Sequence, residues 1–317
     1  MYNFVYCFDK NYIIQALTSF NSLLLNISEK INCYVICDDI ETISYFENYF
    51  KNHKKINELQ LFLFEKSINF PKLENSHVSQ ATYFRIFMDE YLPDYLENII
   101  YLDSDILCLN DPINQINLAI SKMYNSKLTI SAVTEGTSLD SPILFEKLKL
   151  NGEKYFNAGV LIINLNDWRS NNIKNKLLDI MNLRAEDLIF WDQDVMNIFF
   201  DGKYVEIDPS FNFNFTKLEK KLDLKDENIT FLHYSGKQKP WLMENILLPE
   251  SHYYQYYYQK LRLEKYHVVI KIKTKNFKKF LSSIIRFKFL QLDYPFQYFK
   301  IIFVNLSNIL FKKRCIK

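Results

Sequence analysis

The sequence predicts an α/β protein whose centre is a mainly parallel β-sheet covered by helices. Three observations lead to this fold class. Apolar runs of strand length alternate with longer stretches in which apolar residues recur every three or four positions. Connections of helical length between strands are typical of parallel pairing. The chain has 317 residues, which is enough to bury one large core and to carry an additional segment.

The first part of the chain gives the clearest alternation. Predicted strands cover residues 3–8, 31–37 and 59–64, and predicted helices cover residues 11–26 and 40–50. Each of these helices connects two strands, so we expect the three strands to lie parallel to one another.

Later elements extend the same sheet. A helix is expected over residues 80–91, because Pro93 follows and helices usually end before a proline. An apolar strand over residues 98–103 then runs directly into acidic residues. Four further strands are expected at residues 128–133, 160–164, 204–207 and 229–233. A further helix is expected at residues 193–200.

The character of the chain changes near residue 255, which divides it into a main domain (residues 1–255) and a basic, aromatic C-terminal region (residues 256–317). From residue 260 onward, 15 Lys and Arg residues stand against two acidic residues, a net charge of +13. Since the whole chain carries only +2, the remainder carries about −11. This asymmetry indicates that the C-terminal region has a partner of its own.

In the C-terminal region, apolar residues recur at helical spacing between basic ones. The two stretches contain Phe277, Phe280, Leu281, Ile284 and Ile285, and then Phe299, Ile302, Leu306 and Leu310. Basic, aromatic and amphipathic segments are typical of binding to an anionic membrane surface, and we favour this partner. Packing on the main domain is one alternative. Contact with nucleic acid is the other, and we expect no nucleic-acid partner.

Three features of the sequence bear on the location of the protein. No apolar stretch reaches the ~20 residues needed to span a bilayer. The N-terminus lacks the cationic segment of a signal peptide. The five cysteines do not form two matching pairs with the close spacing of metal ligands, and they are interpreted as reduced thiols. We therefore expect a cytoplasmic protein that is attached peripherally to the inner face of the cell membrane.

Two carboxylates lie where the predicted strand at residues 98–103 ends. Asp103 and Asp105 are two positions apart, and such residues point to the same side of an extended backbone. Ligand sites of open parallel sheets lie at the carboxyl ends of the strands, and a divalent cation there would relieve the repulsion between two carboxylates. The alternative is an acidic turn around Ser104 that binds nothing.

His233 should also lie at a strand end, because it follows an apolar run. Gly236 then permits a sharp turn or a close backbone approach to a ligand, and Lys239 is a compact cation suited to a diphosphate. The alternative is a surface loop with a hydrogen-bonded histidine. Together with Asp103 and Asp105, His233 would give mixed nitrogen and oxygen ligation, which favours Mn²⁺ over Mg²⁺.

Six motifs, in this order along the chain, resemble those of the retaining glycosyltransferases of family eight. They are residues 8–12, 77–85, 101–105, 155–164, 191–194 and 233–241, and they span residues 1 to about 250. The similarity is greatest to the bacterial lipopolysaccharide and lipooligosaccharide α-galactosyltransferases and α-glucosyltransferases. It implies a GT-A fold, a Rossmann-like fold that binds nucleotide-diphospho-sugars.

The resemblance also implies roles for individual residues. The implied Mn²⁺ ligands, with Mg²⁺ as the other candidate ion, are Asp103, Asp105 and His233. The implied nucleotide-binding residues are Phe8, Asp9, Asn11, Tyr12, His77, Ser104, Gly236 and Lys239. The residues implied around the donor sugar are Arg85, Asn157, Gly159, Asp192 and Gln193, of which Asp192 and Gln193 are the catalytic candidates.

Three of these assignments have plain structural alternatives. Arg85 could form a salt bridge between a helix and the sheet. Asp192 lies at a predicted helix start, where Asp is a natural N-cap. The segment at residues 157–159 could be a simple tight turn.

The sequence departs from the family pattern in two places. Lys10 stands where the family often has a second acidic residue. The acid that contacts the sugar in the family would fall near residues 134–136, and the choice between galactose and glucose depends partly on that region.

The implied function is transfer of a hexose from a UDP-sugar to a glycan acceptor such as lipooligosaccharide. For retention of configuration we favour attack on the face that the leaving phosphate occupies. A non-catalytic nucleotide-sugar or glycan-binding protein of the same fold is one alternative. A metal-dependent nucleotidyltransferase is another, although residues 8–11 do not form the Gly-rich basic loop that it needs.

Overall fold

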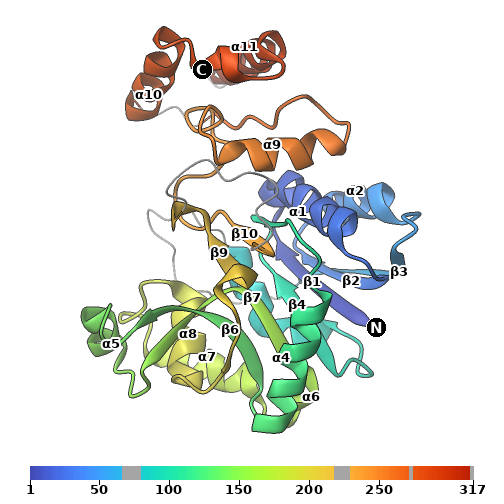
Figure 1. Cartoon of the computed structure of the whole chain (residues 1–317), viewed down its shortest axis with the longest axis vertical. Coiled ribbons are helices and arrows are strands. Elements are labelled where there is room, and N and C mark those ends of the chain that lie inside the picture. The colour runs from blue at the N-terminus through green and yellow to red at the C-terminus, as the bar shows by residue number, and fades with distance from the viewer. Residues whose placement is uncertain (66–79, 218–228, 271–273, 315–317) are drawn as a thin grey trace.

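The protein is described by a computed structural model that covers residues 1–65, 80–217, 229–270 and 274–314. Its centre is a seven-stranded sheet with the order β3-β2-β1-β4-β7-β6-β8 (Figure 1). The strands are β1 (Tyr2–Phe8), β2 (Ile31–Cys37), β3 (Ile56–Leu63), β4 (Asn98–Leu102), β6 (Ile130–Thr137), β7 (Lys154–Asn164) and β8 (Val205–Glu206). A smaller sheet joins β5 (Ile106–Cys108), β10 (Phe231–His233) and β9 (Phe213–Asn214).

Parallel pairing prevails in the large sheet, as the sequence predicts. β1 pairs parallel with β2 and β4, β2 with β3, and β6 with β8. β7 is the exception, because it runs antiparallel to both β4 and β6. The central strands are buried on both faces. In β1, for example, Phe4, Tyr6 and Phe8 enter one core cluster and Val5 and Cys7 the other.

Helices cover both faces of the large sheet. The first core cluster contains α1 (Ile13–Asn26), α2 (Ile40–Phe50), α4 (Ile113–Ser126) and the smaller sheet. The second contains α3 (Met88–Tyr91), α6 (Leu165–Ser170), α7 (Ile173–Leu183) and α8 (Trp191–Phe200). α5 (Pro142–Leu148) packs on Tyr155 in a small cluster of its own.

The helix predicted over residues 80–91 differs from the observed structure. Residues Gln80–Phe87 form a 3₁₀-helix (η2), and only Met88–Tyr91 continue as an α-helix. Side chains three residues apart eclipse one another in a 3₁₀-helix. This geometry places Thr82 and Arg85 on the same side, where both reach Asp192. A second short 3₁₀-helix (η1, Lys10–Tyr12) occupies the predicted start of α1.

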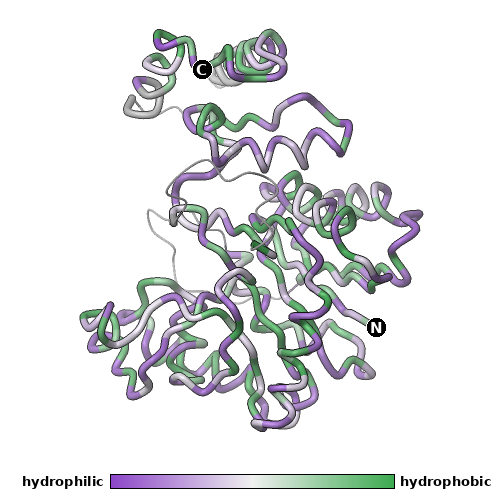
Figure 2. The backbone as a smooth tube through the Cα atoms, viewed as in Figure 1, coloured by the Kyte–Doolittle hydropathy of each residue, from purple (hydrophilic) through white to green (hydrophobic). Residues whose placement is uncertain are grey.

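Most of the C-terminal region lies beyond α9 (Ser251–Lys260), at the end of the molecule drawn in red in Figure 1. It comprises α10 (Thr274–Ile285), a 3₁₀-helix η5 (Lys288–Gln291) and α11 (Pro295–Arg314). Hydrophobic and hydrophilic stretches are interleaved along these helices (Figure 2). In the four described ranges, no helix is both long and apolar enough to cross a membrane.

The division that we predict at residue 255 falls inside α9, which contacts α1. The terminal helices contribute Phe280, Tyr298 and Ile302 to a separate core cluster with Met243, Ile246, Tyr266 and Val268. One side of the C-terminal region therefore packs on the body of the protein.

Candidate active site

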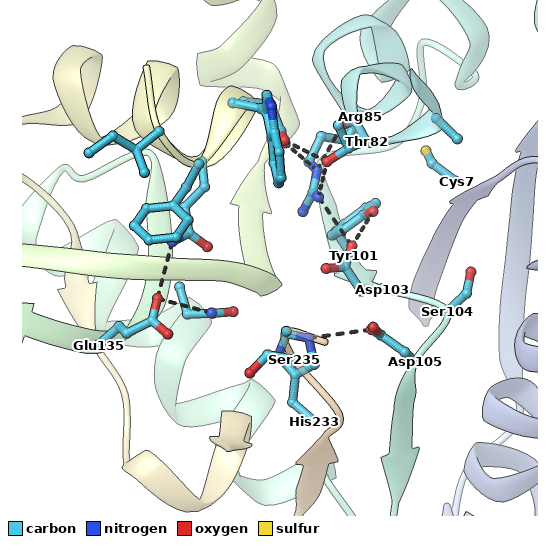
Figure 3. Close-up of a pocket in the computed structure, with 18 of the residues that line it drawn as sticks. Cys7, Thr82, Arg85, Tyr101, Asp103, Ser104, Asp105, Glu135, His233 and Ser235 are labelled. Atoms are coloured by element: carbon cyan, nitrogen blue, oxygen red, sulfur yellow. Dashed lines mark hydrogen bonds and ion pairs between the residues drawn. The ribbon is translucent and has the colours of Figure 1, made fainter. Parts of the chain in front are cut away.

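A cavity of about 680 Å³ lies beyond the carboxyl ends of β1, β4 and β10. Its walls carry polar side chains from segments far apart in the sequence (Figure 3). The predicted residues that line it are Phe8, Asp9, Tyr12, Arg85, Asp103, Ser104, Asp105, Asn157, Asp192, Gln193, His233, Gly236 and Lys239. Asn11 and Gly159 lie outside its lining, and His77 lies outside the described residues.

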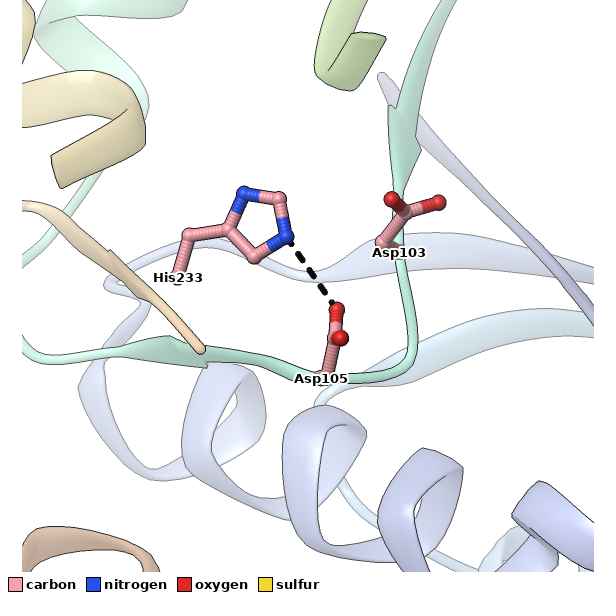
Figure 4. A group of neighbouring side chains, drawn as sticks. All are labelled: Asp103, Asp105 and His233. Atoms are coloured by element: carbon pink, nitrogen blue, oxygen red, sulfur yellow. Dashed lines mark ion pairs between the residues drawn. The ribbon is translucent and has the colours of Figure 1, made fainter. Parts of the chain in front are cut away.

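Asp103, Asp105 and His233, which all line the cavity, lie next to one another (Figure 4). One potential ligand atom from each lies within 4.8 Å of the others. The antiparallel pairing of β10 with β5 places His233 opposite Ile106, directly after Asp105. Nε2 of His233 consequently lies 3.3 Å from Oδ1 of Asp105.

Two neighbours orient the His233 ring. Its Nδ1 lies 2.9 Å from Oδ1 of Asn212, which acts as an acceptor when Nδ1 carries the proton. That tautomer leaves Nε2 free as a ligand facing the carboxylates. Gly159 lies against the other side of the ring, and a Cβ at this position would be 2.4 Å from Cε1 of His233. Gly159 therefore provides space for the imidazole.

Asp105 also has a cationic neighbour, Lys239, in the loop that follows β10. Nζ of Lys239 bonds Oδ2 of Asp105 and also donates to the carbonyl of Tyr234, 2.7 Å away. Burial opposes ionisation of Asp105, but Lys239 and His233 outweigh it and hold the pKa of this carboxyl below its usual range. Asp105 is therefore ionised, and its negative charge is balanced by Lys239, in the loop after β10.

Asp103 is held from the opposite side by a buried arginine. Nη2 of Arg85 lies 3.2 Å from Oδ1 of Asp103, and Nε of Arg85 lies 2.7 Å from Oδ2 of Asp192. The hydroxyl of Tyr101 donates to the same Oδ1 of Asp103 at 2.7 Å, and the guanidinium lies over the Tyr101 ring. Arg85 does form the salt bridge between helix and sheet that was its alternative role, and this salt bridge lies inside the cavity.

Asp192 is not an N-cap. Its Oδ1 accepts a hydrogen bond from the Thr82 hydroxyl at 2.5 Å, and its Oδ2 pairs with Arg85. The N-cap of α8 is Phe190, which makes no side-chain capping bond, and Oδ2 of Asp194 accepts from the backbone amides of Ile189 and Phe190, just before the helix. Burial raises the pKa of Asp192 to about 6, although Arg85 and Thr82 act in the opposite direction.

Glu135 completes the wall around Gln193; it lies in the region, residues 134–136, where the family's sugar-contacting acid was expected, although our list of site residues did not include it. Its Oε2 accepts hydrogen bonds from the side-chain amides of Gln193 and Asn157, each at 3.1 Å. Oε1 of Gln193 accepts from the backbone amide of Ala158 at 3.0 Å, and its Nε2 donates to Glu135 and also to the Tyr155 hydroxyl, 3.0 Å away. Glu135 is the extra residue of a β-bulge, where β6 shifts register against β7 between Thr134 and Gly136.

The residues present fit a divalent cation. Tyr101 and Arg85 both bond Oδ1 of Asp103, which leaves Oδ2 for a ligand bond. Oδ1 of Asp105 and Nε2 of His233 face the same point. Two carboxylates with one imidazole suit Mn²⁺ and similar ions.

Comparisons with known proteins identify the family and the fold. The chain matches Glycosyl transferase family 8 over residues 3–245. The lipopolysaccharide 1,3-galactosyltransferase of Salmonella typhimurium is 28% identical over 249 residues, which cover 76% of this chain and 73% of the relative. The lipopolysaccharide 1,2-glucosyltransferase of Escherichia coli K12 is 28% identical over 261 residues, with coverage of 75% and 72%.

The structural comparison confirms the predicted GT-A fold. The galactosyltransferase LgtC, solved with donor and acceptor sugar analogues, superposes with a TM-score of 0.67 at 20% identity. The match covers 87% of this chain and 99% of LgtC. With three-quarters of the sequence inside the family match, the protein belongs to glycosyl transferase family 8.

Proposed function

We propose that the protein transfers a hexose, galactose or glucose, from a UDP-sugar to a glycan acceptor with retention of configuration. Asp103, Asp105 and His233 hold Mn²⁺ in this proposal. The observation that carries it is the convergence of these three side chains inside one cavity, with their ligand atoms within 4.8 Å. The relatives named as galactosyl- and glucosyltransferases support a hexose, and their lipopolysaccharide substrates support a lipooligosaccharide or other surface-glycan acceptor.

We assign the nucleotide to the side of the cavity next to β1. Phe8, Asp9 and Tyr12 line this side, and Oδ1 of Asp9 is engaged by the backbone amide of Asn11 at 2.8 Å. The Ser104 hydroxyl is buried there without a hydrogen-bond partner among the described residues, which supports a polar ligand at this position. Gly236 and Lys239 extend the same wall toward the diphosphate.

When bound, the cation supplies positive charge where negative charge develops on the departing UDP. Lys239 adds a second positive charge close to the same point. Preorganised charges of this kind are commonly worth several kcal/mol in a dry site, on the order of a 10²–10³-fold rate effect for one donor.

The arrangement around Gln193 supports same-face attack by the acceptor. Both ends of the Gln193 amide are engaged, and Asp192 is paired with Arg85 and Thr82. Neither residue presents a free oxygen for a covalent intermediate. We assign Glu135 to a hydroxyl of the donor sugar, because its carboxylate enters the cavity beside Asn157 and Gln193. A glycosyl group trapped on Asp192, Gln193 or Glu135 in mass spectra would overturn this mechanism.

We also propose that the C-terminal region holds the enzyme at the inner face of the cell membrane. η5 and its neighbours expose large apolar side chains, namely Ile285, Phe287, Leu290, Phe296 and Phe303. Arg286 and Lys300 are exposed among them. Apolar and basic groups together suit an anionic bilayer. In vesicle flotation the chain should float with phosphatidylglycerol and stay at the bottom with phosphatidylcholine alone. Equal behaviour with both lipids would refute this location.

The test of the proposed function is release of UDP by the purified protein from UDP-galactose, UDP-glucose and UDP-N-acetylglucosamine. Release should require Mn²⁺ and should stop with EDTA. If the protein released UDP from none of these donors, even with mixed oligosaccharide acceptors present, the proposed catalysis would be wrong. Tight UDP binding together with such a failure would favour the alternative of a non-catalytic binding protein.

A further inference from the structure

The loop that carries Lys239 is held at both ends and exposed at its tip: it starts at Tyr234, which is buried and donates its amide to the carbonyl of Asp105 at 3.1 Å. Gly236 has a φ of +76°, and no atom lies within 4 Å of where its Cβ would be. The neighbouring residues Lys237 and Gln238 are exposed. The loop becomes buried again at Lys239 and Trp241, and Trp241 is only 3% exposed. Contacts to residues 239–241 therefore hold this end of the loop, in addition to the bonds of the Lys239 side chain to Asp105 and to the carbonyl of Tyr234.

Trp241 lies between the nucleotide side of the cavity and a C-terminal segment. Tyr12, which lines the cavity, meets the indole edge-on at a ring-centroid distance of 6.0 Å. On another side, His267 stacks on the indole at 6.1 Å with an interplanar angle of 18°. The Nδ1 atom of His267 is 2.7 Å from the hydroxyl of Tyr254, which fixes the imidazole.

Residues 266–270, which we call the strap, also bond the backbone that follows the loop. The amide of Val269 donates to the carbonyl of Trp241 at 2.7 Å, and the amide of Met243 donates to the carbonyl of Val269 at 3.1 Å. Leu242 and Val269 form a parallel bridge. The strap therefore acts as a short extra strand beside residues 241–243, and it lies beyond the family match, which ends at residue 245.

One buried amide side chain ties the strap and the loop together. Oε1 of Gln255, on α9, accepts from the backbone amide of His267 at 3.0 Å. Its Nε2 donates to the carbonyl of His267 at 3.1 Å and to that of Pro240 at 3.2 Å. Pro240 directly follows Lys239, so Gln255 links the strap to the residue next to the predicted diphosphate contact.

The terminal helices hold the strap on its other side. Tyr266 and Val268 pack in the core cluster with Phe280, Tyr298 and Ile302. The side chain of Asn305 donates to the carbonyl of Val268 at 3.0 Å, and the Tyr298 hydroxyl donates to the carbonyl of Met243 at 3.3 Å. The C-terminal region is thus connected to the Lys239 loop through defined contacts.

We propose that the strap positions the Lys239 loop for the nucleotide diphosphate, with Gln255 and His267 as positioning residues. The inference rests on the proposed UDP-sugar function. A loop ordered before binding does not lose that conformational freedom when the ligand arrives, so its affinity is higher than that of a free loop. The C-terminal region would then contribute to donor binding as well as to location.

The experiment compares the full-length protein with Gln255→Met, which keeps the side-chain length and loses all three hydrogen bonds. Tyr257→Phe is the matched control, because it removes a buried hydrogen bond to Asn26 from the same helix without contacting the strap. Calorimetric titration of UDP with Mn²⁺ should give a Kd about tenfold higher for Gln255→Met and an unchanged Kd for the control. In turnover, the KM for donor should rise while kcat stays within about threefold of wild type.

Hydrogen exchange supplies a readout that needs no ligand. Amides of residues 234–242 should exchange faster in Gln255→Met than in Tyr257→Phe. His267→Phe keeps a ring beside Trp241 and loses only the bond to Tyr254, so it should give a smaller change in the same direction if Gln255→Met does not fold. If these variants bound UDP with wild-type affinity and showed wild-type hydrogen exchange, the proposed role of the strap would be wrong. Failure of the wild type to bind UDP would instead overturn the proposed function.

Discussion

Asp103 and Asp105 lie two residues apart, yet each carboxylate is held by a different part of the molecule. Asp103 bonds Arg85 and Tyr101, which belong to η2 and β4. Asp105 bonds Lys239 and His233, which belong to β10 and the loop after it. The point where β4 leaves the sheet is therefore where two separately built halves of the site meet.

The two cationic partners differ in chemistry. Arg85 is a planar fork that bridges Asp103 and Asp192. Burial alone would lower its pKa, but these two carboxylates outweigh burial and raise it. Lys239 is a point charge on a flexible stem, in a loop with an exposed tip. Asp103 thus belongs to a fixed framework, whereas the partner of Asp105 can move when a cation and a diphosphate arrive. The following predictions test this contrast.

The largest effect is expected from removing either carboxylate charge. Asp103→Asn and Asp105→Asn should each lower Mn²⁺-dependent UDP release by at least about 10³-fold, because each removes a ligand and a charge from the cation site. Kinetics with saturating donor measure this loss. If either variant kept more than a tenth of wild-type turnover, the three-ligand site would be wrong.

The next largest effect is expected from a substitution of Arg85, which tests the Asp103 half of the site alone. Arg85→Lys keeps the charge but cannot bridge Asp103 and Asp192 together, so turnover should fall roughly 10²-fold. Arg184→Lys is the control, since Arg184 pairs with Asp187 at 2.9 Å near the surface. That half-buried pair at the surface should contribute about 1 kcal/mol or less, and turnover should not change. Equal losses in both variants would show that Arg85 acts only on stability.

Much of this framework follows from sequence periodicity. Alternating strand and helix periods predict the parallel half of the sheet, and strand ends predict the positions of Asp103, Asp105 and His233. Periodicity carries no strand direction, so the antiparallel course of β7 was not predicted. It also does not distinguish a 3₁₀-helix from an α-helix, and the three-residue spacing of Thr82 and Arg85 depends on that difference.

The contacts inside the site depend on tertiary placement that the sequence does not encode locally. Glu135 enters the cavity because of a register shift that only pairing with β7 reveals. Asn212 and Gly159 meet His233 from segments far apart in the sequence. Aspartate is a residue type that often serves as an N-cap. Asp192, however, directly follows Trp191, whose φ is +50°, and its carboxylate points toward Arg85.

A smaller effect should come from the space behind His233. In Gly159→Ala the new methyl would overlap the imidazole, so His233 must move away from the cation. We expect Mn²⁺ affinity to fall by about tenfold to thirtyfold, because one of three ligands is misplaced. Gly136→Ala is the control, since its Cβ would lie 3.4 Å from the Ser141 hydroxyl, an ordinary contact. Manganese titrations that gave the same affinity for both variants would contradict the role of Gly159.

The smallest effect is a pH dependence of stability on the Arg85 side. Burial raises the pKa of Asp192 to about 6 in the folded protein, whereas an unfolded Asp titrates near pH ~3.9. Between these values the folded state binds more protons than the unfolded state, so the stability contributed by Asp192 is lost as pH rises. The free energy of unfolding of the wild type relative to Asp192→Asn should fall by roughly 1–2 kcal/mol from pH 4 to 6.5.

Urea unfolding at several pH values measures this difference, because groups common to both proteins cancel. Asp187→Asn is the control of opposite sign: the hydrogen bond with Arg184 lowers the pKa of Asp187, so its contribution is lost only as pH falls. The wild type should therefore not lose stability relative to Asp187→Asn as pH rises over the same range. A flat difference for Asp192→Asn would mean that Arg85 fully offsets burial. Asp192 would then be a permanent carboxylate, equivalent to Asp105 on the other side of the site.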